Sequence, residues 1–149
     1  MQIKILMVSP VEVVGPETHL QDVARKMRDK AIGCLPVCEN GRLIGVISDR
    51  DIVCRSVANG IDIARTKARD VMTPDVVYCF DDQSDAEAAK MMEDKDIRHL
   101  PVLNRQQKIV GMVTLGDLAL RSKTLTRALL GIIARDALRR EKLHSTHAW

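Results

Sequence analysis

The residues best suited to chemistry lie in two short runs, "GVISDRDIV" at 45–53 and "GMVTLGDLA" at 111–119. In each run a hydroxyl residue, Ser48 or Thr114, stands at the predicted start of a helix, where its side chain and the unpaired backbone N–H groups suit a phosphate. An aspartate follows three residues later, Asp51 or Asp117, and its carboxylate can accept two hydrogen bonds from a ribose diol. The pattern therefore predicts two ribose-phosphate sites, whereas helix capping alone explains either run taken singly.

Arginines extend both runs, because Arg55 and Arg121 each follow the aspartate by four residues. That spacing places the two side chains one turn apart on one face of a helix, so each arginine can reach a phosphate or pair with its own aspartate. The arginine between Asp49 and Asp51 makes these carboxylates a poor cation cage, and no metal is predicted to be required.

Both runs belong to an internal repeat, with two copies of about 50 residues each. Ser9-Pro10 returns as Thr73-Pro74, and the "LPV" that begins at Leu35 returns at Leu100. The repeat predicts a first motif at 6–60, a connector at 61–70, a second motif at 71–122, and a C-terminal helix and tail at 123–149.

Each motif is predicted to be a β-α-β-β-α unit. The β-prone runs "VEVV" and "DVVYCF" come first, and the capping patterns Thr18 to Gln21 and Ser84 to Glu87 predict the helices that follow. The apolar residues predicted to line these two helices are Leu20, Val23, Ala24 and Met27 in the first, and Ala88, Ala89 and Met92 in the second.

The Asn40-Gly41 pair between two apolar runs predicts a β-hairpin, and "LPVLNRQQKIVGMVT" repeats the hairpin with a longer turn. A second helix from about Asp49 is predicted to stop at Asn59-Gly60. Because one such unit is too small to cover its own apolar surface, we expect an α+β fold in which the two motifs pack sheet to sheet with pseudo-twofold symmetry.

Composition excludes several classes of function. The net charge of +3 and the three aromatic residues disfavour nucleic acid, which basic grooves and stacking platforms bind. Four cysteines without paired CxxC spacing, each in an apolar run, predict buried free thiols. Without a signal peptide or an apolar stretch of roughly 20 residues, the chain is predicted to be cytoplasmic, with no membrane partner. Without a phosphate loop, HExxH motif or nucleophile elbow, it is predicted not to be an enzyme.

The order and duplication of these motifs resemble the CBS-domain family, named after cystathionine β-synthase, over about residues 6 to 122. The residues that carry the resemblance are Ser9-Pro10 or Thr73-Pro74, then "IGCLPV" or "IRHLPV", then the two runs above. The tandem arrangement is called a Bateman module. The resemblance implies a regulatory module whose clefts bind an adenosine compound such as AMP, ADP, ATP, NAD or S-adenosylmethionine.

The resemblance also implies which residues line each cleft. One cleft joins Thr114, Asp117 and Arg121 to Ser9, Val14, Ile32, Gly33 and Cys34. The other joins Ser48, Asp51 and Arg55 to Thr73, Tyr78, Ile97, Arg98 and His99. We expect the first cleft to bind more tightly, with adenine against Gly33, ribose on Asp117 and phosphate at Thr114, and with Arg98 or His99 reaching in. The alternative is that the basic pair Arg98-His99 serves the Asp51 cleft.

The tail "TLTRALLGIIARDALRREKLHSTHAW" is predicted to form a one-sided amphipathic helix. Its apolar stripe is Leu125, Leu129, Ile132 and Ile133, and the arginines that lie largely elsewhere are Arg127, Arg135, Arg139 and Arg140. The stripe can pack on the chain's own motif, form a homodimer surface, or dock a regulated protein partner. Two functions stay open: an adenosine-ligand sensor that controls a partner through conformation or dimer state, and a structural dimerisation scaffold with vestigial clefts.

Overall fold

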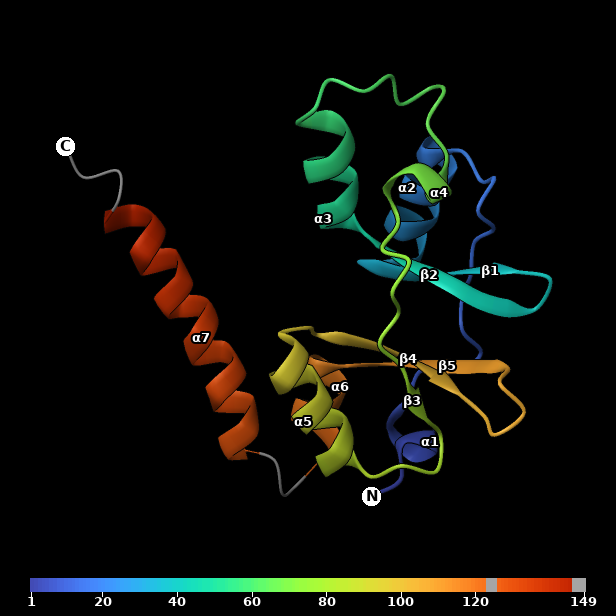
Figure 1. Ribbon diagram of the computed structural model, residues 1–149. Helices are drawn as coiled ribbons and strands as arrows, with labels where there is room; N and C mark the ends of the chain where they lie inside the picture. The colour runs from blue at the N-terminus through green and yellow to red at the C-terminus, as the bar shows by residue number, and fades with distance from the viewer. Residues whose placement is uncertain (123–125, 146–149) are drawn as a thin grey trace. The chain divides into compact units, whose positions relative to one another are not determined.

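The structure, a computed structural model, describes residues 1–122 and 126–145 (Figure 1). The residues cluster into two compact units, and each unit is assembled from separate stretches of the chain. Unit 1 holds Met1–Ser9, Cys79–Val102 and the described part of Gly111–Trp149, and unit 2 holds Pro10–Tyr78 and Leu103–Val110. The units therefore do not follow the order of the repeats along the chain.

The short helices that precede the Ser-Pro and Thr-Pro pairs are α1 (Ile3–Leu6) and α4 (Ala68–Val71). Helix α1 belongs to the unit of the second motif, where the N–H of Ile3 donates to the carbonyl oxygen of Gln83 at 2.9 Å. Helix α4 belongs to the unit of the first motif, where the N–H of Ala68 donates to the carbonyl oxygen of Thr18 at 2.8 Å. Each motif is thus completed by a helix that lies outside its own repeat.

Unit 2 contains α2 (Leu20–Lys30), β1 (Cys34–Glu39), β2 (Arg42–Ser48), α3 (Asp49–Ile52) and the π-helical turn η1 (Val53–Val57). Strands β1 and β2 pair antiparallel, and Asn40 and Gly41 between them have φ of 50° and 76°. Two consecutive left-handed residues form the tight hairpin turn that the sequence predicts, which is confirmed. Of the "VEVV" run, Val14 alone forms a bridge, to Val37.

The predicted cap of α2 is wrong. The helix begins at Leu20 with His19 as its N-cap, and the hydroxyl of Thr18 instead accepts a hydrogen bond from the N–H of Gly15 at 3.1 Å. Thr18 closes the turn before the helix and so is not available to cap it. Leu20, Val23 and Met27 are buried as predicted, but Ala24 is exposed.

Unit 1 contains β3 (Cys79–Phe80), α5 (Asp85–Lys95), β4 (His99–Leu103), β5 (Ile109–Thr114), α6 (Leu115–Arg121) and α7 (Thr126–Ser145), with the tip of the β4–β5 hairpin grouped in unit 2. The three strands form one sheet in the order β3-β4-β5. The capping box of α5 is confirmed, because the N–H of Glu87 donates to Ser84 Oγ at 3.2 Å and the N–H of Ser84 donates to Glu87 Oε2 at 2.8 Å. The predicted face of this helix is also buried.

The core of unit 2 brings α2, the β1–β2 hairpin and α4 together. Its buried apolar residues are Val14, Leu20, Val23, Met27, Leu35, Val37, Ile47, Ala68 and Val71. Removing a large aliphatic side chain from water stabilises a fold by about 1.5 to 3 kcal/mol. Because Val71 and Ala68 come from the helix beside the second motif, the first motif depends on that helix for a closed core.

Glycines begin both runs because another stretch of backbone passes against them. A Cβ on Gly45 would lie 2.5 Å from Met72 Sδ and 3.1 Å from the carbonyl oxygen of Thr73. Gly111 stands in the same way against Met7 and Val8. The close approach lets backbone bridges form at Val46–Thr73 and Val8–Met112, which fix each Ser/Thr-Pro segment against the strand that leads into a run.

No helix in residues 1–122 or 126–145 combines the length and apolarity that crossing a bilayer requires.

Candidate functional site

The first run forms a capping box at the start of α3. The N–H of Asp51 donates to Ser48 Oγ at 3.0 Å, and the N–H of Ser48 donates to Asp51 Oδ2 at 2.9 Å. These reciprocal bonds satisfy two backbone donors at the helix start. Helix capping is therefore established for this run, and it uses one of the two oxygens of the Asp51 carboxylate.

The second run has the same geometry at the start of α6. The N–H of Asp117 donates to Thr114 Oγ1 at 3.1 Å, and both the N–H and the hydroxyl of Thr114 donate to Asp117 Oδ2, at 2.9 and 2.7 Å. Among the described residues none donates to the other oxygen, Asp117 Oδ1. Capping and ligand binding can coexist here, because the second oxygen keeps its lone pairs for a diol.

The surroundings of the two runs differ in charge. In the first run the carboxylate of Asp49 accepts from the N–H of Arg50 at 2.8 Å, at the place where an anion would meet the helix start. The second run carries the uncharged Leu115 at the position of Asp49. Negative charge beside an anion is unfavourable, and this difference favours phosphate at Thr114.

The arginine of the first run holds the polypeptide that leads into Thr73. Arg55 Nη1 donates to the carbonyl oxygens of Val71 at 2.9 Å and Met72 at 3.0 Å, and Arg55 Nη2 lies 3.7 Å from Asp51 Oδ1. Sequence spacing left open whether this arginine pairs with its aspartate. The structure shows a long ion pair with Asp51 and two shorter bonds to backbone that sequence spacing did not predict.

Arg121 acts in the same way in unit 1, where its Nη1 donates to the carbonyl oxygen of Leu6 at 3.2 Å. The two arginines therefore fix corresponding segments, one before Ser9 and one before Thr73. Both residues are exposed, and each guanidinium has further donors that can turn toward a ligand.

Each run lies beside the strand start of its own motif. The N–H of Asp49 donates to the carbonyl oxygen of Gly33 at 2.9 Å, and the N–H of Leu115 donates to that of Arg98 at 2.9 Å. Cys34 pairs with Ser48 across the β1–β2 hairpin. Within unit 1 the structure thus brings the backbone of Arg98 next to the start of the Thr114 helix, whereas the Arg98 guanidinium forms an ion pair with Asp136.

The predicted clefts draw on both units. Of the first cleft, Ser9, Thr114, Asp117 and Arg121 lie in unit 1, and Val14, Ile32, Gly33 and Cys34 lie in unit 2. Of the second cleft, Ser48, Asp51, Arg55, Thr73 and Tyr78 lie in unit 2, and Ile97, Arg98 and His99 lie in unit 1. The joining of these groups into two clefts stays a prediction.

The cysteines are free thiols, as the sequence predicts, but the predicted burial is confirmed only for Cys79: Cys34 and Cys38 are half-buried, and Cys54 is exposed, which is a correction. Burial raises the pKa of Cys34 to about 12, with a further contribution from the negative charges of Asp51 and Asp49. Burial likewise raises the pKa of Cys79 to about 12. In the part of the chain that the structure describes, no three His, Cys, Asp or Glu side chains are grouped to hold a metal ion.

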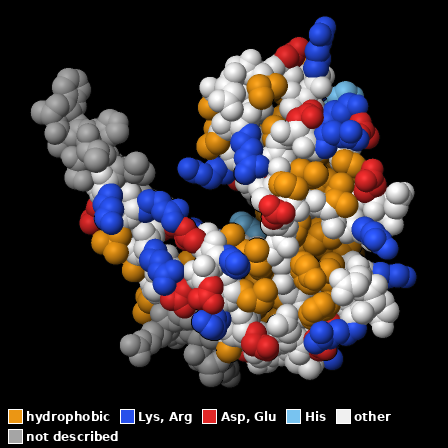
Figure 2. Space-filling view, in the orientation of Figure 1, with side chains coloured by type: hydrophobic (Ala, Val, Ile, Leu, Met, Phe, Trp, Pro, Cys, Tyr) orange, Lys and Arg blue, Asp and Glu red, His pale blue; other side chains and the backbone are white. Residues whose placement is uncertain are grey.

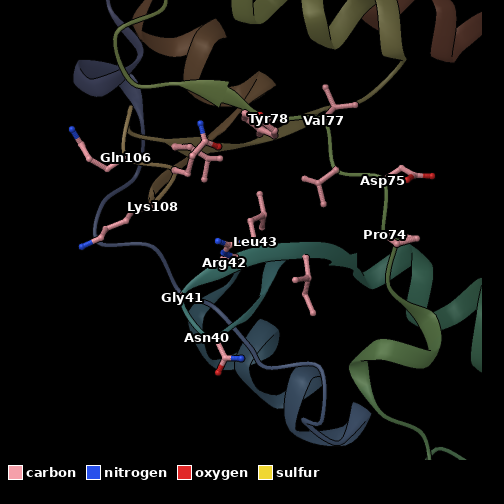
Figure 3. Close-up of a pocket in the computed structure, with 14 residues that line it drawn as sticks. Asn40, Gly41, Arg42, Leu43, Pro74, Asp75, Val77, Tyr78, Gln106 and Lys108 are labelled. Atoms are coloured by element: carbon pink, nitrogen blue, oxygen red, sulfur yellow. The ribbon is translucent and has the colours of Figure 1, made fainter.

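A pocket of about 1110 Å³ lies in unit 2 (Figure 3). Its lining residues are Asn40, Gly41, Arg42, Leu43, Ile44, Pro74, Asp75, Val76, Val77, Tyr78, Leu103, Gln106, Gln107 and Lys108. Of the predicted cleft residues, Tyr78 is the one that lines it. Sequence reasoning missed this pocket, although Arg42 and Lys108 stand at corresponding positions of the two hairpins and carry the same charge.

Comparisons with known proteins agree with the duplicated architecture. The CBS domain family model matches twice, at residues 3–57 and 68–123. The CBS domain-containing protein YhcV of Bacillus subtilis is 37% identical over 117 residues, which cover 78% of this chain and 82% of YhcV.

Solved structures share the fold. Hypoxic Response Protein I, crystallised with two coordinated zinc ions, superposes with a TM-score of 0.74 at 32% identity and covers 81% of this chain and 98% of its own. CBSX2, crystallised with AMP, has a TM-score of 0.71 at 24% identity and covers 85% and 98%. With two matched motifs in one chain and this shared fold, the protein belongs to the CBS-domain family as a tandem pair of CBS domains.

Proposed function

We propose that this chain is a regulatory module that binds an adenosine-containing ligand in the clefts between its motifs and controls a protein partner through its conformation or dimer state. The observation that carries this function is the duplicated helix start, in which a half-buried hydroxyl and a half-buried aspartate repeat with the same geometry at Ser48–Asp51 and Thr114–Asp117. Capping alone needs only one carboxylate oxygen, and the second oxygen of Asp117 is available for a ribose diol.

AMP, ADP and ATP are the first ligands to test, and NAD and S-adenosylmethionine follow. CBSX2, a protein of this fold, was crystallised with AMP, which makes AMP the natural probe. We assign the tighter site to the cleft that contains Thr114 and Asp117, with adenine against Ile32, Gly33 and Cys34. Two features support the assignment: the backbone of Arg98 adjoins the Thr114 helix, and an uncharged residue takes the place of Asp49 there.

The experiment is an AMP titration by calorimetry, on protein from which carried-over ligand has been removed. Asp117→Asn should weaken AMP binding about tenfold or more, because a bond to a charged group is worth about 1.5 to 3 kcal/mol. Asp70→Asn is the matched control: at the start of α4 the Asp70 carboxylate accepts from the N–H of Lys67 at 2.8 Å, as Asp117 accepts from Thr114, but Asp70 lies in neither predicted cleft. Loss of the tighter phase in Asp51→Asn alone would reverse the assignment of the two clefts.

We propose that binding leaves the nucleotide unchanged. Chromatography of ATP or AMP after prolonged incubation should return the same compound. If no adenosine compound gives heat with the wild-type chain, the scaffold function replaces the sensor function.

We also propose a homodimer that forms through the helices following the two runs. Exposed apolar side chains on these helices support it, with Val53 and Val57 on η1 at 56% and 55% exposure and Leu120 on α6 at 87%. Exposed patches of large aliphatic side chains are characteristic of interfaces.

Sedimentation at micromolar concentration tests this dimer. The wild-type chain should sediment as a dimer, and Leu120→Glu should yield a monomer. Ile133→Glu, which places the same charge on α7, should leave the dimer intact; dissociation by Ile133→Glu alone would move the interface to the tail.

A further inference from the structure

Helix α7 is held against the C-terminal end of α5. Leu129 and Ile132 are buried, with 7% and 2% of their surface exposed, and α7 contacts both α5 and α6. This confirms two positions of the predicted apolar stripe. Ile133 is 55% exposed, which is a correction to that stripe, and Leu125 lies outside the described residues.

Arginines of α7 complement the negative end of α5. Arg135 donates to the carbonyl oxygen of Glu93 at 3.0 Å and to Glu93 Oε1 at 3.0 Å, and Arg139 pairs with Asp96 just beyond the end of α5. Free carbonyls and the helix dipole make this end of a helix attractive to cations. Figure 2 shows basic and acidic side chains lying next to one another along α7.

One contact of α7 has the opposite polarity. Asp136, one of two acidic residues in α7, forms an ion pair with Arg98, the residue just before β4. The Asp136 side chain is 26% exposed and that of Arg98 is 45% exposed. The Asp136 carboxylate thus pairs with the guanidinium of Arg98, a residue predicted to contact the ligand's phosphate.

We infer that Asp136 is an internal competitor of the nucleotide phosphate, so that docking of α7 at Arg98 and phosphate binding at Arg98 exclude each other. This inference rests on the proposed nucleotide function. It holds whichever cleft Arg98 serves, because it depends on Arg98 and Asp136 alone.

Charge and accessibility explain the competition. A phosphate at Arg98 would stand beside the Asp136 carboxylate, and two anions at one partly exposed cation repel each other. The phosphate carries the larger charge and can displace the carboxylate, whereas the arginine contacts of α7 with Glu93 and Asp96 favour re-docking when nucleotide leaves. Binding would therefore release α7 and change the surface that this helix offers to a partner.

Population arithmetic sets the size of the effect. If the chain with Arg98 released from Asp136 is a minor fraction of the population, the apparent affinity for AMP is reduced in proportion to that fraction. Removing the Asp136 carboxylate restores the full affinity. Asp136→Asn removes both the competing ion pair and the repulsion of the phosphate, so it should raise AMP affinity about three- to tenfold.

The experiment titrates AMP into four variants of the full chain. Asp136→Asn removes the competitor, and Glu141→Gln is the matched control, because it removes the same charge from an exposed position of the same helix. Arg98→Ala and Arg98→Ala/Asp136→Asn complete a double-mutant cycle. We expect a gain for Asp136→Asn, no change for Glu141→Gln, and no further gain from Asp136→Asn when Arg98 is absent.

Hydrogen exchange supplies a second readout. Saturating AMP should speed amide exchange at 129–139 in the wild-type chain, because a helix that has lost its packing frays. Equal AMP affinity in the wild-type and Asp136→Asn chains would overturn the competition, and so would unchanged amide exchange in α7 at saturating AMP. In either case the proposed function would still stand if AMP binding depended on Asp117. Absence of AMP binding in every variant, Asp136→Asn included, would overturn both.

Discussion

Arg55 donates to the carbonyl oxygen of Val71 at 2.9 Å, across 16 positions of the sequence. The bond joins the helix that follows the first run to the segment that enters the Thr73-Pro74 pair. Arg121 makes the corresponding bond to Leu6 at 3.2 Å, across 115 positions. The same residue type at the same place in both motifs therefore fixes the segment that leads into each Ser/Thr-Pro pair.

Arg55→Lys should lower the free energy of unfolding by about 1 to 2 kcal/mol, because a lysine cannot reproduce the paired bonds to Val71 and Met72. Urea unfolding followed by circular dichroism measures the change. Arg50→Lys, an exposed replacement in the preceding turn, is the control and should change stability by less than about 0.5 kcal/mol. Equal stability of the two variants would show that the Arg55 bonds are not stabilising.

Ser48→Ala and Thr114→Ala should each cost about 0.5 to 2 kcal/mol, because each removes the side-chain acceptor of a capping box. Thr18→Ala should cost less, since Thr18 accepts from the N–H of Gly15 and caps no helix. Thermal unfolding of the three variants side by side tests the order. A Thr18 variant as unstable as the other two would restore the cap predicted from the sequence.

Gly45→Ala should destabilise the chain by about 1 to 3 kcal/mol, because the added methyl group would meet Met72 and the backbone of Thr73. Gly116→Ala is the matched control. A Cβ at Gly116 meets Thr114 Oγ1 at 3.5 Å, an ordinary contact, and alanine favours a helix over glycine. Denaturant unfolding should therefore show that Gly116→Ala is more stable than the wild-type chain. If Gly45→Ala and Gly116→Ala were destabilised by equal amounts, the close approach at Gly45 would be contradicted.

Cys54, which is exposed, should react fastest with a thiol reagent at pH 8, and Cys54→Ser should abolish the fast phase. The thiolate is the reactive form, and the pKa of Cys34 and of Cys79 is raised to about 12 by burial, so both should react slowly in the folded chain. A fast phase that survives in Cys54→Ser would contradict this order.

The same two thiols predict how stability depends on pH. Between about pH 9, where the unfolded thiols ionise, and about pH 12, the unfolded chain binds fewer protons than the folded chain. The free energy of unfolding should therefore be fully retained below pH 9 and fall as pH rises through this window. Urea midpoints at pH 8 and pH 10 measure the fall, and replacing Cys34 and Cys79 by Ala should reduce it.

Local patterns in the sequence determine much of this protein. The repeat, the Asn40-Gly41 hairpin and the capping boxes at Ser84, Ser48 and Thr114 depend on residues within a few positions of one another, so their spacing predicts them. The cap predicted at Thr18 is wrong for a local reason as well, since a nearer backbone donor, Gly15, takes the hydroxyl.

Tertiary structure alone decided which distant segments complete each motif. Helix α1 joins the unit of the second motif and α4 that of the first, and Arg98 pairs with Asp136 across 38 positions, counted as 136 minus 98. No local spacing encodes such choices. They follow from which apolar faces and charges meet when the chain closes its cores, and that selection depends on the free energy of the whole packed unit rather than on any short stretch of sequence.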